Sequence, residues 1–141
     1  KELIEYGCEI IRVAVPDAEA AQALQKIKKG IKIPLIADIH FDYRLALTAL
    51  ANGVDGLRLN PGNIGEPDKI KKVVLAAKER GVPIRIGLNA GSLPKTTNTR
   101  LSVATRMVHA ALEQIRLLES LDFNLIKRTF GILQFLGIGR T

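Results

Sequence analysis

The chain has 141 residues, of which 47% are hydrophobic and 25% are charged. This balance is typical of a globular domain and excludes a disordered segment, which would carry fewer apolar residues. The formal net charge of +7 is compatible with an anionic partner, although most lysines fall in runs such as Lys26–Lys29 and Lys69–Lys72, which are typical of solvated helix faces.

The cysteine content and the first residues bear on the compartment. Cys8 is the only cysteine, which excludes an internal disulfide framework and a thiolate metal cluster, and fits a reducing cytosol. We expect it to be buried at the entry to a strand. No apolar run reaches the length of a membrane span, and the first residues lack a signal-peptide core. The chain starts at Lys1, so we expect it to begin inside a longer gene product.

Two strand–helix units are predicted in the first half of the chain. The first pairs the apolar run Ile10–Val15 with a helix that begins after Asp17 and ends at Gly30, two residue types favoured as helix caps. Its expected core-facing residues are Ala20, Ala23, Leu24 and Ile27. The second unit pairs Leu35–His40 with a short helix capped by Asp42.

The second half repeats the pattern. Gly56–Asn60 is followed by a tight turn over Leu59–Gly65 and a helix over residues 66–81, whose expected inward residues are Ile70, Val73, Val74 and Ala77. Ile84–Asn89 leads through a polar loop to a long helix. Its apolar residues recur at helical spacing: Leu101, Ala104, Val108, Ala111, Leu112, Ile115 and Leu118. A fifth strand is expected at Leu125–Ile126.

This alternation predicts an α/β fold with a parallel sheet and right-handed crossovers. Two architectures fit, an open doubly wound sheet and a (β/α)8 barrel. Helices cover both faces of an open sheet, so both strand faces are then apolar, whereas here one face turns polar toward the strand ends, as at a barrel mouth. We therefore predict a partial (β/α)8 TIM barrel of four to five βα units, fewer than a closed barrel contains.

The polar strand face is the main functional signal. Residues two apart share a face of a strand, so one face collects Arg12, Asp38, His40, Arg58, Asn60, Arg85 and Asn89. One alternative is that each arginine pairs with Asp38. However, a single carboxylate does not neutralise three guanidinium groups, and the planar arginine fork suits phosphate or carboxylate. We therefore expect a shared polar cavity that binds an anion.

Two loops and one strand end add candidates. The Asn60–Gly65 turn offers backbone amides to an oxyanion, and Gly87–Ser92 combines small residues that let a ligand approach with the Ser92 hydroxyl. The glycine spacing is not that of a dinucleotide fingerprint. Asp38 and His40 are able to bind a metal, act as acid and base, or orient substrate hydroxyls, but two ligands are too few to predict a metal site.

Four motifs, in their order and spacing, resemble the 4-hydroxy-3-methylbut-2-enyl diphosphate synthase family: Arg12–Pro16, Ala37–Asp42, Leu57–Gly65 and Pro83–Leu93. The resemblance covers residues 1–127 and implies an iron–sulfur oxidoreductase of the methylerythritol phosphate route to isoprenoids. Such an enzyme reductively opens 2-C-methyl-D-erythritol 2,4-cyclodiphosphate with electrons from ferredoxin or flavodoxin. The resemblance also implies a homodimer and a separate C-terminal domain that holds a [4Fe-4S] cluster through three cysteines and a glutamate.

The resemblance also implies roles for the polar face. Three arginines would bind the cyclic diphosphate: Arg12, Arg58 and Arg85. Asn60 and Asn89 would add hydrogen bonds, and Asp38 and His40 would lie near the polyol part of the substrate. Asn63 and Ser92 are further substrate-binding candidates.

The chain departs from the family in two ways. The cluster domain is absent and Cys8 matches no cluster ligand, so we expect this chain to be inactive alone. After Lys127 the family continues with a serine and a substrate-contacting lysine, whereas residues 128–141 diverge. We therefore expect a partial substrate-binding TIM-barrel domain over residues 1–127 and a tail over 128–141 that results from a frameshift or truncation. Translation of the downstream DNA in all three frames tests this hypothesis.

Two other functions remain open at this level. Another barrel enzyme, such as a dihydropteroate-synthase-like pterin transferase, would bind a pterin without a diphosphate. The net charge of +7 also suggests a basic phosphate- or nucleic-acid-binding module. The aromatic content of 4% provides few platforms for base stacking, which argues against the nucleic-acid alternative.

Overall fold

The computed structural model describes residues 2–88, 93 and 100–127. Its strands are β1 (Ile11–Ala14), β2 (Leu35–Ile39), β3 (Gly56–Leu59), β4 (Ile84–Ile86) and β5 (Ile126–Lys127). Its helices are α1 (Glu2–Glu5), α2 (Ala18–Gly30), α3 (Tyr43–Ala51), α4 (Pro61–Ile64), α5 (Pro67–Arg80) and α6 (Val103–Ser120). None of the helices in these described residues is long and apolar enough to cross a membrane.

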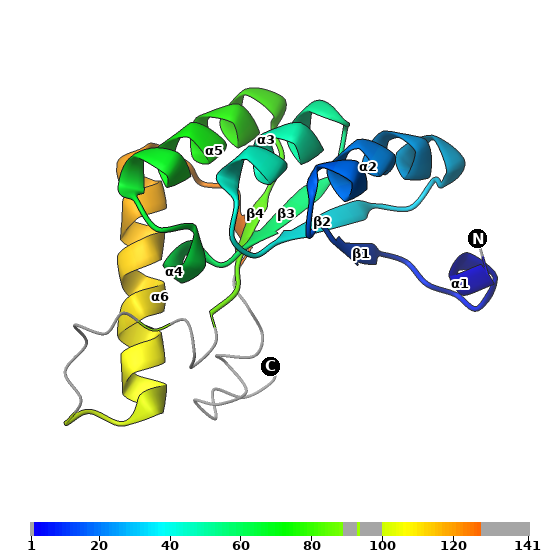
Figure 1. Ribbon diagram of the computed structural model, residues 1–141. Helices are drawn as coiled ribbons and strands as arrows, with labels where there is room; N and C mark the ends of the chain where they lie inside the picture. Colours follow the sequence, from blue (N-terminus) through cyan, green and yellow to red (C-terminus); the bar gives the residue numbers. More distant parts are fainter. Residues whose placement is uncertain (1, 89–92, 94–99, 128–141) are drawn as a thin grey trace.

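The strands form one parallel sheet in the order β1-β2-β3-β4-β5. Helices α2, α3 and α5 lie along one face of this sheet, as Figure 1 shows. A doubly wound sheet would have helices on both faces and a break in strand order. The arrangement instead confirms the predicted α/β fold, an arc of a TIM barrel. Each of the first four strands is shorter than the apolar run that predicted it.

The helix ends follow the predicted caps. The Asp17 carboxylate accepts a hydrogen bond from the Ala20 N–H at 2.8 Å, and the Asp42 carboxylate accepts one from the Arg44 N–H at 2.9 Å. Gly81 follows α5 with φ = 63°, in the left-handed region that glycine adopts at low cost. These three residues therefore fix where α2, α3 and α5 begin or end.

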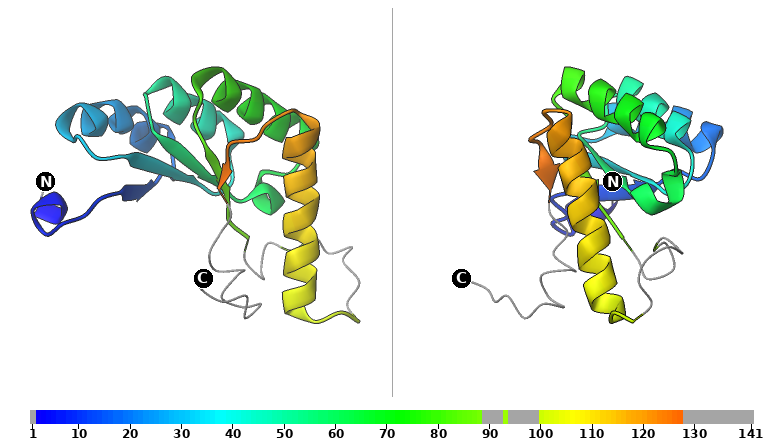
Figure 2. Two further views of the ribbon diagram at one scale, coloured as in Figure 1. Left: turned by 180° about the vertical axis from the view of Figure 1, so that it is seen from behind. Right: turned by 90° about the vertical axis from the view of Figure 1, so that its left-hand side faces the viewer.

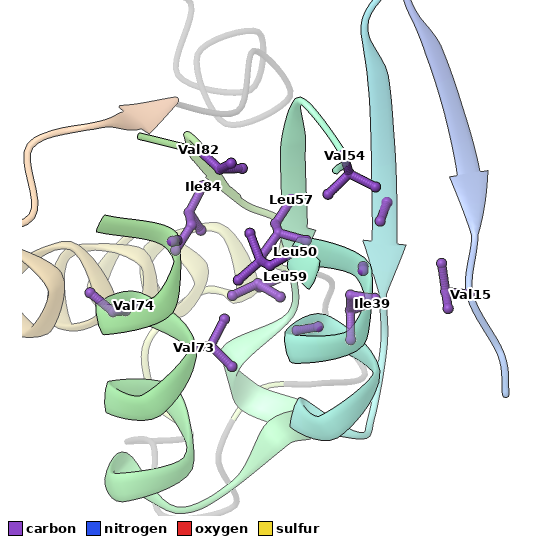
Figure 3. Close-up of a cluster of buried hydrophobic side chains, with 14 of the residues drawn as sticks. Val15, Ile39, Leu50, Val54, Leu57, Leu59, Val73, Val74, Val82 and Ile84 are labelled. Atoms are coloured by element: carbon purple, nitrogen blue, oxygen red, sulfur yellow. The ribbon is translucent and has the colours of Figure 1, made fainter. Parts of the chain in front are cut away.

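The hydrophobic core lies between the sheet and these helices. Leu57 and Leu59 of β3 point toward Leu50 of α3 and the α5 residues Val73 and Val74 (Figure 3). All five side chains are 2% exposed or less, and the four residues predicted to face inward from α5 are buried. Because side chains alternate along a strand, this packing leaves Arg58 on the opposite face of the sheet.

Helix α2 buries only part of the predicted face: Leu24 is buried and Ala20 packs against the core, as expected. Ala21 and Leu24 are buried in α2, whereas Ala23 is exposed and Ile27 is 37% exposed. Ala23 lies about 200° around the helix from Ala21 and points away from the core. The alanines of α2 lie on several sides of the helix, so its sequence pattern does not select a single buried face.

Helix α6 stands at the β4–β5 side of the sheet (Figure 2). Ala111 and Leu118 are buried as predicted, but Leu101 is 36% and Leu112 is 44% exposed. Leu112 lies about 100° around the helix from Ala111, at the edge of the apolar arc. The helix therefore buries a narrower stripe than its sequence predicts.

Asp55 joins α2, β2 and β3 at the amino ends of the strands. Its carboxylate accepts hydrogen bonds from Lys28 Nζ at 2.5 Å and from the Leu35 N–H at 2.7 Å. Burial opposes ionisation of Asp55, but these hydrogen bonds outweigh it and hold its pKa below the ordinary value. This charged group therefore fixes the end of the sheet opposite to the polar side chains.

The prediction for Cys8 is wrong. Cys8 is only partly buried and lies ahead of β1, with its Sγ 3.1 Å from the Ile10 carbonyl oxygen, to which it donates. Within the described residues β1 pairs with β2 alone, so Cys8 leads into an edge strand of the sheet.

A candidate anion-binding site on the open face of the sheet

Strand register places the predicted polar residues side by side. Asp38 of β2 pairs with Arg58 of β3, and Arg58 pairs with Arg85 of β4. The residues on either side of each of them along the strand are buried against the helices. The three polar side chains therefore share the face that α2, α3 and α5 leave open, as the two-residue period predicts.

Asp38 is the centre of this group. Its Oδ1 accepts a hydrogen bond from Arg58 Nη1 at 2.9 Å, and the two side chains are only 10% and 16% exposed. His40 Nε2 lies 3.4 Å from the same oxygen, and Arg12 Nε lies 3.5 Å from Oδ2. The structure thus confirms that Asp38, His40, Arg58 and Arg12 gather at one point.

The expected shared polar cavity does not enclose Arg12. Its side chain is 55% exposed, far more than that of Arg58. β1 is the edge strand of the described sheet, so one flank of Arg12 has no neighbouring strand. Its contribution to the site is therefore screened by solvent, and the pair of Asp38 with Arg58 dominates the local electrostatics.

Arg85 has no carboxylate partner within the described residues, although it is half-buried. Asp38 is already shared by Arg58, Arg12 and His40. Among these described residues, the three arginines therefore exceed the one carboxylate by two positive charges when His40 is neutral. A partly buried guanidinium group without a counter-charge is a feature that an anionic ligand would stabilise.

Asn60, directly after β3, is a second unsatisfied group. The residue is 0% exposed, and neither Oδ1 nor Nδ2 has a hydrogen-bond partner in the part of the chain described. An unpaired buried amide costs about 1–3 kcal/mol, so buried polar groups normally have partners. Asn60 therefore carries a buried donor and a buried acceptor, both without a partner in the described residues, directly after the carboxyl end of β3.

The segment after Asn60 differs from the predicted tight turn. It forms the one-turn helix α4, in which the N–H groups of Asn63 and Ile64 donate to the Asn60 carbonyl oxygen at 3.0 and 3.3 Å. Asn63 is half-buried, and within the described residues its side chain makes no hydrogen bond to Arg12, Arg58 or Arg85. Asn89 and Ser92 lie outside the described residues, so their predicted roles stay predictions.

A surface cavity of about 540 Å³ lies elsewhere, beside α3, α4 and the start of α5. Its lining residues are Phe41, Asp42, Tyr43, Arg44, Ile64 and Lys69. None of the predicted site residues lines it, and the sequence analysis did not anticipate it. Arg44 is already paired with Asp42 there, at 2.7 Å. We therefore place the candidate site on the open sheet face, where unpaired polar groups lie.

No metal site accompanies these residues. Within residues 2–88, 93 and 100–127, no group of three or more histidine, cysteine, aspartate or glutamate side chains is placed to hold a metal ion. Asp38 and His40 do contact each other, but with Arg58 and Arg12 as their other neighbours. The two guanidinium groups beside Asp38 repel a metal cation, so the arrangement suits an anion.

Comparison with known proteins gives one consistent result. Residues 1–131 match the GcpE TIM-barrel domain. The chain is 65% identical over 127 residues to a 4-hydroxy-3-methylbut-2-en-1-yl diphosphate synthase (flavodoxin) of Dehalococcoides mccartyi strain CBDB1. The aligned region covers 90% of this chain and 36% of that protein. Proteins of the same name from Caldicellulosiruptor saccharolyticus and Thermodesulfovibrio yellowstonii are 60% and 59% identical over 86% and 90% of the chain. The chain spans only 36% and 37% of the length of these two.

Proposed function

The chain belongs to the GcpE TIM-barrel family, and from that membership we propose that it is the substrate-binding part of a flavodoxin-dependent 4-hydroxy-3-methylbut-2-en-1-yl diphosphate synthase. Its proposed ligand is 2-C-methyl-D-erythritol 2,4-cyclodiphosphate, bound on the open face of the sheet. The observation that carries the proposal is the excess of arginine over carboxylate on this face, with Arg85 left unpaired among the described residues.

Each residue of the site has a proposed role in ligand binding that follows from its chemistry. Arg58 and Arg85 are neighbours in register and would donate hydrogen bonds to the diphosphate oxygens. The buried Asn60 amide would satisfy both its donor and its acceptor on the ligand. Asp38 holds Arg58 in place and keeps an acceptor near the strand ends for a substrate hydroxyl. Together these groups bind and orient a diphosphate, which is a positioning role.

The [4Fe-4S] cluster implied by the family resemblance does not fit this chain. Three cysteines are needed, the sequence contains only Cys8, and the described residues hold no metal-ligating group. We therefore derive no electron-transfer step from these residues. Flavodoxin is the proposed electron donor because the relatives' names specify it. The homodimer, and the domain boundary after Lys127, stay predictions.

Calorimetric titration with the cyclodiphosphate tests the proposal. The Arg85→Ala variant is expected to bind about 10- to 100-fold more weakly, because a contact between charged groups contributes about 1.5–3 kcal/mol. Arg80→Ala is the matched control: it removes the same charge from the exposed end of α5, where Arg80 Nη1 lies 3.9 Å from Glu79. Equal affinities of both variants and the unchanged chain, or no binding at all, would refute the proposed site.

A further inference from the structure

Gly87 lies against the guanidinium group of Arg58. A Cβ atom placed on Gly87 would come closest to Arg58 Nε, and it would be 2.5 Å from Arg58 Nη2 and 2.6 Å from Arg58 Cζ. Real Cβ atoms essentially never approach other heavy atoms within 3.0 Å. The sequence analysis assigned the small residues of this loop to the approach of a ligand, whereas at Gly87 the group that approaches is a side chain of the site itself.

The backbone of Gly87 has little freedom to move away. Its N–H donates to the Leu59 carbonyl oxygen at 2.8 Å and so continues the β3–β4 ladder beyond Ile86. Gly87 does not share the positive φ of Gly53 or Gly81. Its φ therefore does not require glycine, and the constraint is space.

Arg58 is held from two sides. Its Nη1 donates to Asp38, while Nη2 and Cζ lie over Gly87. Any side chain at position 87 would push the guanidinium group off this position, and with it the contact to Asp38. Because Arg58 is only 16% exposed, its guanidinium group would lose a mostly buried position as well as its partner.

We propose that Gly87 is a positioning residue of the anion site, because only a residue without a Cβ atom lets the Arg58 guanidinium lie between β4 and Asp38. The expected effect of position 87 on diphosphate binding rests on the proposed function. Its structural part, the coupling of position 87 to Arg58, is independent of any ligand. Of the other glycines whose surroundings are described, Gly56 would meet the Ile36 side chain, and the rest have open space.

The test is a double-mutant cycle of Gly87→Ala and Arg58→Ala, read out by calorimetry with 2-C-methyl-D-erythritol 2,4-cyclodiphosphate. Gly87→Ala is expected to weaken binding by about tenfold when Arg58 is present, and by less than about twofold in the Arg58→Ala background. Gly30→Ala is the matched control, since a Cβ atom there meets nothing within 4 Å. Full affinity of Gly87→Ala, or an equal loss in both backgrounds, overturns the proposal.

Urea unfolding of the same four proteins separates this proposal from the proposed function. If position 87 acts through Arg58, Gly87→Ala lowers the free energy of unfolding less in the Arg58→Ala background than in the unchanged chain, whether or not the diphosphate binds. Additive losses of stability overturn the proposal even if the unchanged chain binds the diphosphate. If Gly87→Ala does not fold, a folded double variant supports the coupling, whereas an unfolded double variant beside a folded Arg58→Ala variant contradicts it.

Discussion

Replacing Asp38 with alanine is expected to lower the free energy of unfolding by about 3 kcal/mol, because it removes one partner of a buried ion pair. Arg58 would keep its buried guanidinium group but lose the 2.9 Å contact, and Arg12 and His40 would lose the same neighbour. Urea denaturation measures the loss. Asp68→Ala is the control, since Asp68 is exposed in the first turn of α5 and contributes less than about 1 kcal/mol.

The Asp38→Ala variant also tests whether the Asp38 carboxylate occupies positive charge that an anionic ligand would otherwise bind. Inorganic pyrophosphate should raise the melting temperature of Asp38→Ala more than that of the unchanged chain, because the added anion then supplies the missing counter-charge. No greater stabilisation of the variant would contradict an anion site at Arg58 and Arg85.

Replacing Phe123 with alanine should cost about 3–5 kcal/mol of folding stability, the usual range for a buried aromatic residue. Phe123 is 1% exposed, and its N–H donates to the Leu118 carbonyl oxygen at 3.1 Å, where the chain leaves α6 for β5.

Urea or thermal denaturation measures this effect as well. Phe41→Ala is the matched control, since Phe41 is 72% exposed and its loss should cost less than about 0.5 kcal/mol. Equal losses for the two phenylalanines would contradict the packing of the α6–β5 connection.

Most of the fold follows from local signals in the sequence. Asp17, Asp42 and Gly81 determine helix ends through their own backbone and side-chain chemistry, so they could be predicted without tertiary information. The alternation around Arg58 and Arg85 likewise predicts which face each strand buries. These signals depend on residues close in sequence, and the structure confirms them.

Positions that depend on distant neighbours were predicted less well. The exposure of Arg12 follows from the position of β1 at the edge of the sheet. The exposure of Leu112 follows from which side of α6 is buried. Neither is encoded in the local pattern. The one-turn helix α4 was missed because Pro61 and Gly62 are also typical of a turn.

The site was predicted as a set of residues but not as a geometry. Strand period brought Asp38, Arg58 and Arg85 together, yet it did not reveal that Asp38 is already paired or that Arg85 is left without a carboxylate. The packing of Arg58 on Gly87 depends on the register of β3 against β4, which the sequence does not state.

The most direct test of the anion site is nitrogen NMR of the arginine Nε–Hε groups during titration with 2-C-methyl-D-erythritol 2,4-cyclodiphosphate. The signals of Arg58 and Arg85 should shift together and saturate at the same ligand concentration. Those of Arg44 and Arg80, which lie on the outer helices, should stay unchanged. Shifts confined to Arg44 and Arg80, with Arg58 and Arg85 unmoved, would contradict a diphosphate site on the open face of the sheet.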